Sequence, residues 1–362
     1  MMKTRLLIAM ILAGLLAGCN LFGNGDDDGT GTPWEEKSAL QLKGIEEPTL
    51  SVLFSADGTR IISGWDNDTT GVWDATTGEL LAKYPLRAEY LSRTTDPAVI
   101  VAHDGSALHF VRYETGEVTK TIPDIGRAFS YDPASGLVAI VVEGAMISDT
   151  TNRVEVRNTI TGELVSSFEQ PRVAYYDKYL PTITGIALQP GGDIVVTGFN
   201  ESIHTNWPQH NTIHIWDAAT GATRVVIDSA YTARCEFLHF FSPDGTQLLT
   251  RGRGADLLSW NTSTWETTWD DDYPYNLTTI AFTPNGQQII TASDYVLYRC
   301  SALSGEWIAT LGENRGEIGT IDVSPDGKYA VTGSIAPSYR YRLSTFPVPY
   351  TDWYLRVWNL SP

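Results

Sequence analysis

A short turn motif that recurs along the chain is the feature that most restricts its fold. Each copy ends in glycine, carries proline, alanine, Asp, Asn or Gly in the middle, and lies between two apolar runs. Residues of these types at these positions favour tight hairpin turns, so each copy predicts a pair of antiparallel strands. The copies are Ser55–Gly58, Gln189–Gly192, Ser242–Gly245, Thr283–Gly286 and Ser324–Gly327.

A second signal, Trp followed by Asp or Asn, closes a later strand in several of the same units. With the register of these dipeptides fixed, three weaker copies fill the remaining gaps. Successive copies are 38 to 59 residues apart. Most spacings agree with the roughly 40–45 residues of a four-stranded propeller blade, so we count seven units. The copies are Trp73-Asp74, Val111-Arg112, Arg157-Asn158, Trp216-Asp217, Trp260-Asn261, Cys300-Ser301 and Trp358-Asn359.

Together, these turns and terminal Trp-Asp dipeptides resemble the WD-repeat family over Ser38 to Pro362. The resemblance implies an all-β fold: a seven-bladed β-propeller of four-stranded antiparallel blades that serves in binding or scaffolding. The sequence contains no Gly-His dipeptide. We therefore expect the family's histidine-centred polar network to be absent or rebuilt.

The two ends of this region predict how the ring closes. The stretch Trp358–Pro362 reads as the end of a third strand with no fourth, and Ser38–Gly44 reads as the missing outer strand. Pairing the first segment with the last blade would complete the ring and remove a weak seam.

The first residues resemble the leader of a bacterial lipoprotein. Residues 1–18 form a signal peptide, with Lys3 and Arg5 before an apolar stretch that is too short to span a bilayer. The sequence Leu16-Ala17-Gly18-Cys19 resembles the lipobox, which implies cleavage before Cys19 and lipidation of its thiol. Residues 19–37 are a Gly/Asp-rich tether, and residues 38–362 form the propeller. Asn20 resembles an outer-membrane sorting signal, so we expect a lipid-anchored protein of the bacterial cell envelope.

The charge balance narrows the choice of partners. The chain carries 43 acidic and 25 basic residues, a net charge of −18, which argues against a nucleic-acid partner. It would also repel anionic headgroups, so attachment to a membrane would depend on the lipid anchor alone. We expect a monomeric propeller without a cofactor, and a protein or peptide partner in the cell envelope.

Extra residues accumulate in loops that the antiparallel topology assigns to one face. Calling the strands of a blade a to d from the axis outward, the surplus lies in b–c and d–a connections, at Gly144–Asn152, Gln170–Pro181, Asn200–Asn211 and Ile335–Asp352. Aromatic residues on rigidly supported loops favour recognition, although they could also pack on the rim. The candidate partner-binding residues are Tyr175, Tyr176, Tyr179, Trp207, Tyr339, Tyr341, Tyr350 and Trp353.

Two groups of residues are candidate metal sites, and each also has a structural interpretation. His204, His210 and His214 lie close together, but His214 is expected on a strand and His210 in a loop, so polar loop histidines are the favoured interpretation. Asp66 and Asp68 open a segment that resembles a calcium loop, without the acidic residue needed six positions after Gly71.

A disulfide between the remaining cysteines is not expected. Cys235 is assigned to the start of strand a of blade 5, near the axis, and Cys300 to the end of strand c of blade 6. Their α-carbons should then be farther apart than the roughly 6 Å that a disulfide tolerates.

The sequence contains no nucleophile elbow, Cys/His pair or phosphate-binding glycine loop. We therefore predict a protein–protein interaction or scaffolding module that uses the b–c/d–a loop face. The alternative is a propeller enzyme or a glycan-binding protein with a site at the mouth of the central channel.

Overall fold

The structure is a computed structural model. All the residues it describes lie within the unit formed by residues 37–362. They are residues 38–42, 45, 47–142, 151–171, 182–200, 211–229, 239–251, 257–271, 277–293, 295–314, 316–335 and 354–360.

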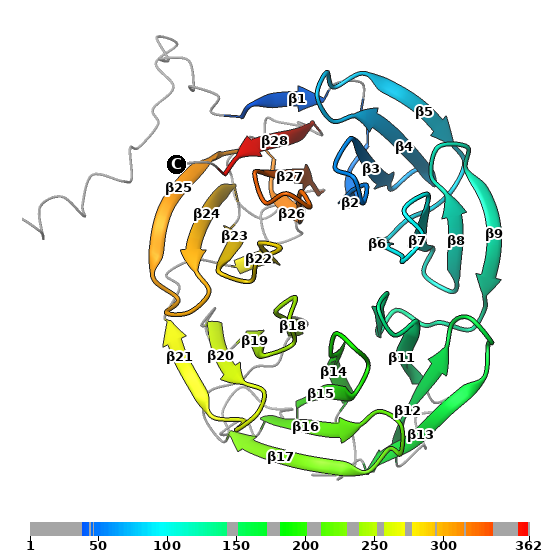
Figure 1. Ribbon diagram of the computed structural model, residues 1–362, viewed down its shortest axis with the longest axis vertical. Helices are drawn as coiled ribbons and strands as arrows, with labels where there is room; N and C mark the ends of the chain where they lie inside the picture. Colours follow the sequence, from blue (N-terminus) through cyan, green and yellow to red (C-terminus); the bar gives the residue numbers. More distant parts are fainter. Residues whose placement is uncertain are drawn as a thin grey trace, which may run out of the picture. The chain divides into compact units, whose positions relative to one another are not determined.

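The described part of the chain folds as seven four-stranded antiparallel sheets arranged as the blades of a β-propeller (Figure 1). The predicted all-β, seven-bladed architecture is confirmed. The first four blades contain β2 (Thr49–Phe54), β3 (Arg60–Trp65), β4 (Thr69–Asp74) and β5 (Leu80–Tyr84); β6 (Tyr90–Arg93), β7 (Val99–His103), β8 (Leu108–Arg112) and β9 (Glu117–Ile122); β10 (Phe129–Asp132), β11 (Leu137–Val142), β12 (Thr151–Asn158) and β13 (Leu164–Pro171); and β14 (Thr182–Leu188), β15 (Ile194–Asn200), β16 (Asn211–Asp217) and β17 (Thr223–Ser229). The last three contain β18 (His239–Phe241), β19 (Gln247–Arg251), β20 (Leu257–Asn261) and β21 (Thr267–Asp271); β22 (Leu277–Phe282), β23 (Gln288–Ser293), β24 (Val296–Ser301) and β25 (Trp307–Glu313); and β26 (Ile318–Val323), β27 (Tyr329–Ser334), β28 (Leu355–Asn359) and β1 (Leu40–Leu42).

Ring closure follows the prediction from the chain ends. Strand β1 pairs antiparallel with β28, with Leu40 opposite Val357 and Leu42 opposite Leu355, and becomes the outer strand of blade 7. It is shorter than the predicted Ser38–Gly44 segment. The side chain of Leu42 is fully buried in the apolar cluster between blades 7 and 1.

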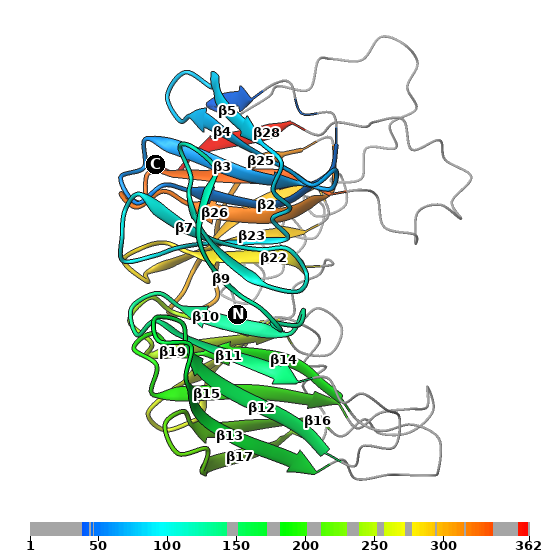
Figure 2. The ribbon, with the colours of Figure 1, turned by 90° about the vertical axis from the view of Figure 1, so that its right-hand side faces the viewer.

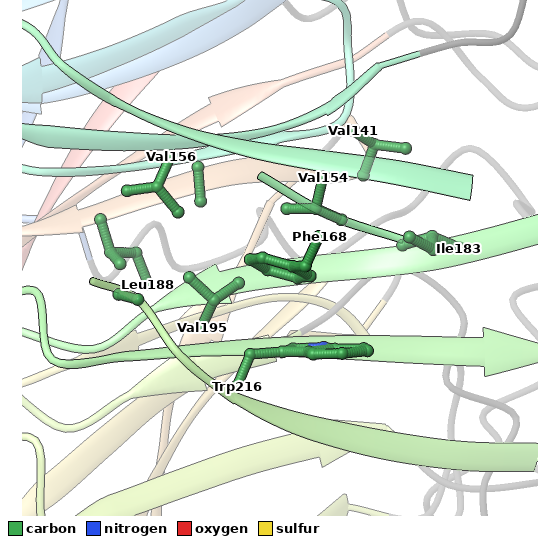
Figure 3. Close-up of a cluster of buried hydrophobic side chains, with 10 residues drawn as sticks. Val141, Val154, Val156, Phe168, Ile183, Leu188, Val195 and Trp216 are labelled. Carbon is green, nitrogen blue, oxygen red and sulfur yellow. The ribbon is translucent and has the colours of Figure 1, made fainter. Parts of the chain in front are cut away.

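The hydrophobic core consists of seven clusters, one at each interface between neighbouring blades. Figure 3 shows the cluster between blades 3 and 4, in which Phe168 of blade 3 stacks on Trp216 of blade 4 with ring centroids 4.5 Å apart. Each sheet is therefore covered on both faces by its neighbours, which removes its apolar surface from water.

The Trp of the repeated dipeptide has the same role in four blades. Trp73, Trp216, Trp260 and Trp358 are almost fully buried, and each lies in the cluster shared with the preceding blade. In three of them the indole N–H donates to a threonine hydroxyl of the adjacent strand at 2.9 Å, which satisfies a buried polar group. The donor–acceptor pairs are Trp216–Thr197, Trp260–Thr250 and Trp358–Thr332.

The weaker repeat copies occupy equivalent positions. The pairing between strands c and d shifts register next to Trp73, Val111, Arg157, Trp216, Trp260 and Cys300. The same irregularity at the same place in six blades supports the alignment made from sequence.

Some predicted boundaries were wrong. Strand β12 begins at Thr151, and β13 continues to Pro171, so both long connections of blade 3 are shorter than predicted. Gly71, the last residue of the segment that resembles a calcium loop, belongs to β4. The first strand of blade 5, β18, begins at His239, and Cys235 lies outside the described residues. Cys300 is buried in β24 as predicted.

Candidate functional site

The propeller has two faces, which differ in how their connections are built. We call the face with the a–b and c–d connections the turn face, and the face with the b–c and d–a connections the loop face. In Figure 2 the hairpin turns of the turn face lie along the left side of the propeller.

On the turn face, the a–b turns satisfy their own polar groups. In the first one, Ser55 Oγ donates to Asp57 Oδ1 at 2.5 Å, and the Gly58 N–H donates to the Ser55 carbonyl at 2.9 Å. The hydrogen bond from Ser55 is the main reason why the pKa of Asp57 lies below its ordinary value. The turns at Ser242, Thr283 and Ser324 repeat both hydrogen bonds.

The c–d turns explain why Asp or Asn follows Trp in the repeated dipeptide. The Asp74 carboxylate accepts hydrogen bonds from the backbone N–H groups of Thr77 and Thr76, at 3.0 and 2.9 Å, and these lower its pKa. Asn158 makes the equivalent bonds in blade 3. The second residue of the dipeptide therefore caps a turn, and its role is structural.

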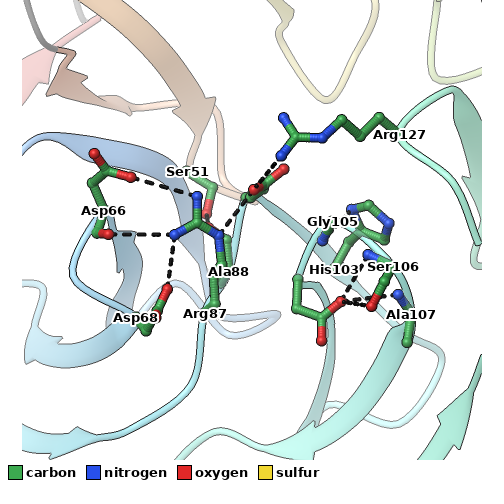
Figure 4. Close-up of polar contacts among 12 residues, drawn as sticks. Ser51, Asp66, Asp68, Arg87, Ala88, His103, Gly105, Ser106, Ala107 and Arg127 are labelled. Carbon is green, nitrogen blue, oxygen red and sulfur yellow. Dashed lines mark hydrogen bonds and ion pairs between the residues drawn. The ribbon is translucent and has the colours of Figure 1, made fainter.

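The loop face presents a charged network over blades 1 to 3 (Figure 4). Arg87 lies in the connection from β5 to β6. Its guanidinium contacts Asp68 at 2.7 Å, Glu89 at 2.9 Å and Asp66 at 3.4 Å, and the hydrogen bonds to Asp68 and Glu89 raise its pKa. Glu89 also contacts Arg127 at 3.2 Å, whose side chain is 74% exposed. The network thus joins the b–c turn of blade 1 to the segment that leads into blade 3.

Aromatic side chains lie beside this network where two inner strands begin. Tyr90, the first residue of β6, is 36% exposed, and its ring meets that of Phe129, the first residue of β10, edge to face at 5.1 Å. On the other side, Phe129 contacts His103 with ring centroids 4.4 Å apart. Since inner strands line the axis of a propeller, this pair lies at the channel mouth on the loop face.

His103 holds the connection from β9 to β10 in place. Its Nδ1 accepts from the Gly105 N–H at 3.3 Å, so Nε2 carries the proton that is donated to the Ile125 carbonyl at 3.0 Å. The side chain is 2% exposed, and burial lowers its pKa. A neutral histidine therefore takes part in a polar contact between blades 2 and 3, although the chain has no Gly-His dipeptide.

A histidine–carboxylate contact lies on the same blade. His109 Nε2 is 2.9 Å from Asp104 Oδ2, and its Nδ1 is 3.0 Å from the Thr121 hydroxyl. Burial acts to raise the pKa of Asp104, but the hydrogen bonds from His109 and from the turn N–H groups hold it well below its usual range.

The base of the blade 7 insertion is held by a buried arginine. Arg356 on β28 is 2% exposed and donates to the Asn314 side-chain carbonyl, while Asn314 Nδ2 donates to Ser334 Oγ at 2.9 Å. Ser334 ends β27, so this network joins the two strands between which residues 336–353 are inserted.

A different polar cluster links the inner strands near the turn face. Arg93 of blade 2 donates to the Phe54 carbonyl of blade 1 at 3.0 Å and forms an ion pair with Asp322 of blade 7. The Phe54 N–H donates to the same Asp322 carboxylate at 2.7 Å. Burial raises the pKa of Asp322, and Arg93 opposes this effect. Arg93, Phe54 and Asp322 therefore join blades 2, 1 and 7 through hydrogen bonds and an ion pair.

The residues predicted for binding and lipidation lie outside the described residues. This applies to Cys19 and to the loop aromatics Tyr175, Tyr176, Tyr179, Trp207, Tyr339, Tyr341, Tyr350 and Trp353. Their roles stay predictions. The strand ends that flank the four long connections do emerge on the loop face, as the topology required.

The candidate metal ligands have other surroundings where they are described. His214 lies on β16 as predicted, stacked on Trp216, and burial lowers its pKa; His204 and His210 are not among the described residues. Asp66 and Asp68 pair with Arg87 instead of converging on a cation position. Over the described ranges, no group of three or more His, Cys, Asp or Glu could hold a metal ion.

The sequence interpretation missed the cluster formed by Arg87, Glu89, Tyr90, Phe129 and Arg127. No repeated motif marks these residues, because they lie in d–a connections or in the first positions of inner strands. A signal was available: once the register is fixed, the segment Arg87–Tyr90 falls on the loop face beside the axis.

Among the described residues, no helix has the length and hydropathy needed to cross a bilayer.

The fold places the chain in the class of seven-bladed β-propellers. No protein-family model and no curated protein sequence matches it. Among solved structures, 1632 chains match, which shows how common the architecture is. One of them, entitled "Structure of U3-55K", superposes with a TM-score of 0.64 at 11% identity, over 90% of this chain and 100% of that chain. At this identity the similarity establishes the fold alone.

Proposed function

We propose that this chain is a lipid-anchored, WD-repeat-like propeller of the bacterial cell envelope that binds a protein or peptide partner through its loop face. The contrast between the two faces is the observation that carries the proposal. On the turn face, the polar groups of the turns are bonded within the turn, as Ser55 is to Asp57, or to the turn of a neighbouring blade, as Gln189 is to the Gly245 carbonyl. The loop face combines the partly exposed Tyr90 and the half-buried Phe129 with a charged network on fixed strand ends, and aromatic and arginine side chains dominate interface energetics.

The residues that hold the strand ends next to the long connections also favour partner binding at the loop face. Arg356, Asn314 and Ser334 fix the strands on either side of the blade 7 insertion, and the cluster around Phe129 fixes the opposite side of the channel mouth. A rigid base lowers the entropy that the loops lose on binding. A ligand held between blades 3–4 and blade 7 would then contact Tyr176, Trp207 and Trp353.

The test is affinity capture from envelope extract with the mature chain, followed by measurement of affinity for the captured partner. The variants are the triple variant Tyr176→Ala/Trp207→Ala/Trp353→Ala and the double variant Tyr90→Ala/Arg127→Ala. We expect each to lose at least about 2 kcal/mol of binding free energy. The control is Pro243→Ala in a turn of the other face. Unchanged affinity in both loop-face variants, or a loss confined to the control, would refute the proposal.

Anchoring is tested separately. Cys19→Ser removes the thiol on which lipidation depends, so the variant should incorporate no labelled fatty acid and should leave the membrane fraction. Labelling that persists in this variant would show that the leader has been misread.

The alternative, an enzyme or glycan-binding protein at the channel mouth, stays a prediction from the sequence. The acid near the channel whose pKa is raised, Asp322, is paired with Arg93 and with a backbone N–H, an arrangement suited to joining blades.

A further inference from the structure

The chain enters the propeller on the turn face of blade 7. Strand β28 runs from the loop face to the turn face, and β1 pairs with it antiparallel, so β1 begins at the turn-face end. Its first pair is Leu40 with Val357, and the Leu40 side chain packs against the c–d turn of blade 1 at Gly78. The part of the chain that precedes residue 38 therefore joins the propeller on the turn face.

Exposed apolar side chains lie on the two blades that flank this entry point. Figure 1 shows β1 on the rim between β25 of blade 6 and β5 of blade 1. Where the c–d turn of blade 6 leads into β25, Leu303 is 85% exposed and Trp307 is 63% exposed. At the same place in blade 1, Leu80 is 41% exposed and Leu81 is 47% exposed. We call these two apolar pairs the flanking corners; both lie at the turn-face end of their blades.

Blade 3 has a similar apolar corner in a different position. Ile160 is 74% exposed and Leu164 is 55% exposed, again where the c–d turn leads into the outer strand. Around the ring, blade 3 is two blades from blade 1 and three from blade 6. This corner has the same chemistry without the entry of the chain beside it, so it can separate the effect of apolar character from the effect of position.

A lipid anchor at Cys19 would bring the flanking corners to a bilayer. From Cys19 to Ser38 an extended chain spans at most about 65 Å. This reach would keep the rim of blade 7 near the membrane, but it would leave the tilt of the propeller to be set by its surface. Exposed Leu and Trp side chains gain free energy when they enter the boundary between headgroups and acyl chains, where Trp is enriched.

The charges beside the flanking corners indicate the kind of lipid surface. Glu79 and Glu306 each precede the apolar residues of one corner, and both are exposed. Together with the net charge of −18, these carboxylates would repel anionic headgroups. A zwitterionic headgroup has no net charge, and its ammonium group can pair with a carboxylate. The same charges oppose contact with a second copy of this chain.

We propose that the flanking corners of blades 6 and 1 are a docking surface for a zwitterionic lipid bilayer, which holds the propeller with this part of its turn face toward the membrane. The inference rests on the lipid anchor of the proposed function: the anchor retains the chain at the membrane, and the flanking corners orient it. The loop face, at the other end of the blades, is then directed away from the bilayer and is open to a partner.

The test supplies its own anchor, so it does not depend on whether Cys19 is lipidated. Residues 20–362, with a hexahistidine tag before Asn20, are held on zwitterionic vesicles that contain a nickel-chelating lipid. Hydrogen–deuterium exchange of the backbone amides is compared with that of the same chain free in solution. We expect exchange to slow at least about fivefold in residues 301–308 and 74–81, and to stay unchanged in residues 158–165 of blade 3.

A matched pair of variants separates position from apolar character. Leu303→Ser/Trp307→Ser should remove the slowing in residues 74–81, which these substitutions do not touch, because the two corners contact the bilayer together. Ile160→Ser/Leu164→Ser makes the same kind of change on blade 3 and should leave the slowing intact. Leu80→Ser/Leu81→Ser, measured in residues 301–308, is the second variant should the first fold poorly.

Three results would overturn the proposal: no slowing in the vesicle-bound chain, equal slowing in residues 158–165, or equal losses in the blade 6 and blade 3 variants. Slowing that needs no vesicles and increases with protein concentration would assign the corners to a second copy, and slowing that increases when anionic lipid is added would contradict a zwitterionic surface. Failure of Cys19 to incorporate fatty acid would refute the proposed anchoring and would leave the result on vesicles unchanged.

Discussion

The two faces of this propeller are built by different rules. On the turn face, each turn is held by hydrogen bonds between residues a few positions apart, such as Ser55 with Asp57, and the pattern repeats from blade to blade. On the loop face, ion pairs join segments far apart in the chain, such as Arg127 with Glu89 and Arg87 with Asp68. The comparison teaches that the repeated sequence encodes the scaffold, whereas the variable connections are free to carry recognition.

We expect the largest loss of stability from removing β1, because this segment from the start of the chain packs on a turn of blade 1. The side chain of Leu40 packs on the c–d turn of blade 1 at Gly78, and Leu42 is fully buried at the seam. Deleting residues 38–42 should therefore lower the free energy of unfolding by at least about 4 kcal/mol, since it removes buried leucine and exposes the edge of β28. Chemical denaturation measures it. Deleting residues 23–31 is the control, and equal losses in the two truncations would contradict the closure by β1.

Glycine substitutions compare the two faces directly. A Cβ at Gly64 would lie 2.1 Å from the Ala88 carbonyl oxygen, in the connection to the next blade, whereas a Cβ at Gly162 would meet nothing within 4 Å. Gly64→Ala should cost about 3 kcal/mol through this overlap with backbone. Gly162→Ala should cost only about 1–2 kcal/mol, because its φ of +78° strains any other residue. If thermal denaturation gave the opposite order, the packing of the connections on the loop face would be looser than described.

The pH dependence of stability tests the buried histidine of the loop face. Burial lowers the pKa of His103, so the unfolded chain binds this proton more readily, and stability is lost as the pH falls below the ordinary histidine value. Between about pH 7.5 and 5.5 the wild type should lose stability more steeply than His103→Gln, by up to about 1.4 kcal/mol per pH unit. Identical slopes would show that His103 is not buried as a neutral ring.

In the same pH series, the hydrogen-bonded carboxylates of the turn face should change the free energy of unfolding only at acidic pH. Asp57 and Asp74 have lowered pKa values, so the stability that they contribute is present above their ordinary value of 3.8 and disappears as the pH falls through the lowered values. The wild type and His103→Gln should therefore show the same loss of stability at acidic pH.

The smallest expected effect is that of the charged network. The Arg87 guanidinium is 30% exposed, and two of its three partners, Asp66 and Asp68, are more than half exposed, so these ion pairs contribute little to stability. Arg87→Met should change the free energy of unfolding by less than about 1 kcal/mol. It should alter binding at the loop face more than it alters stability. A loss comparable with that of Gly64→Ala would mean that the network holds blades 1 to 3 together.

Most of the architecture could be predicted because it depends on local signals. Turn motifs such as Ser242–Gly245 and the dipeptides ending in Asp or Asn mark hairpins, and their spacing gave the number of blades. Prediction failed where the ends of strands depend on their partners: β12 begins at Thr151 and β13 continues to Pro171 because these residues pair with each other across the sheet.

The sequence alone determined the repeat, the turns and the identity of the closing strand, because each depends on residues near one another or on a strand missing from one unit. Only the tertiary structure decided which side chains meet at the channel mouth. Tyr90 and His103 belong to blade 2, and Phe129 belongs to blade 3. Such contacts arise from the packing of distant segments, which no local pattern in the chain records.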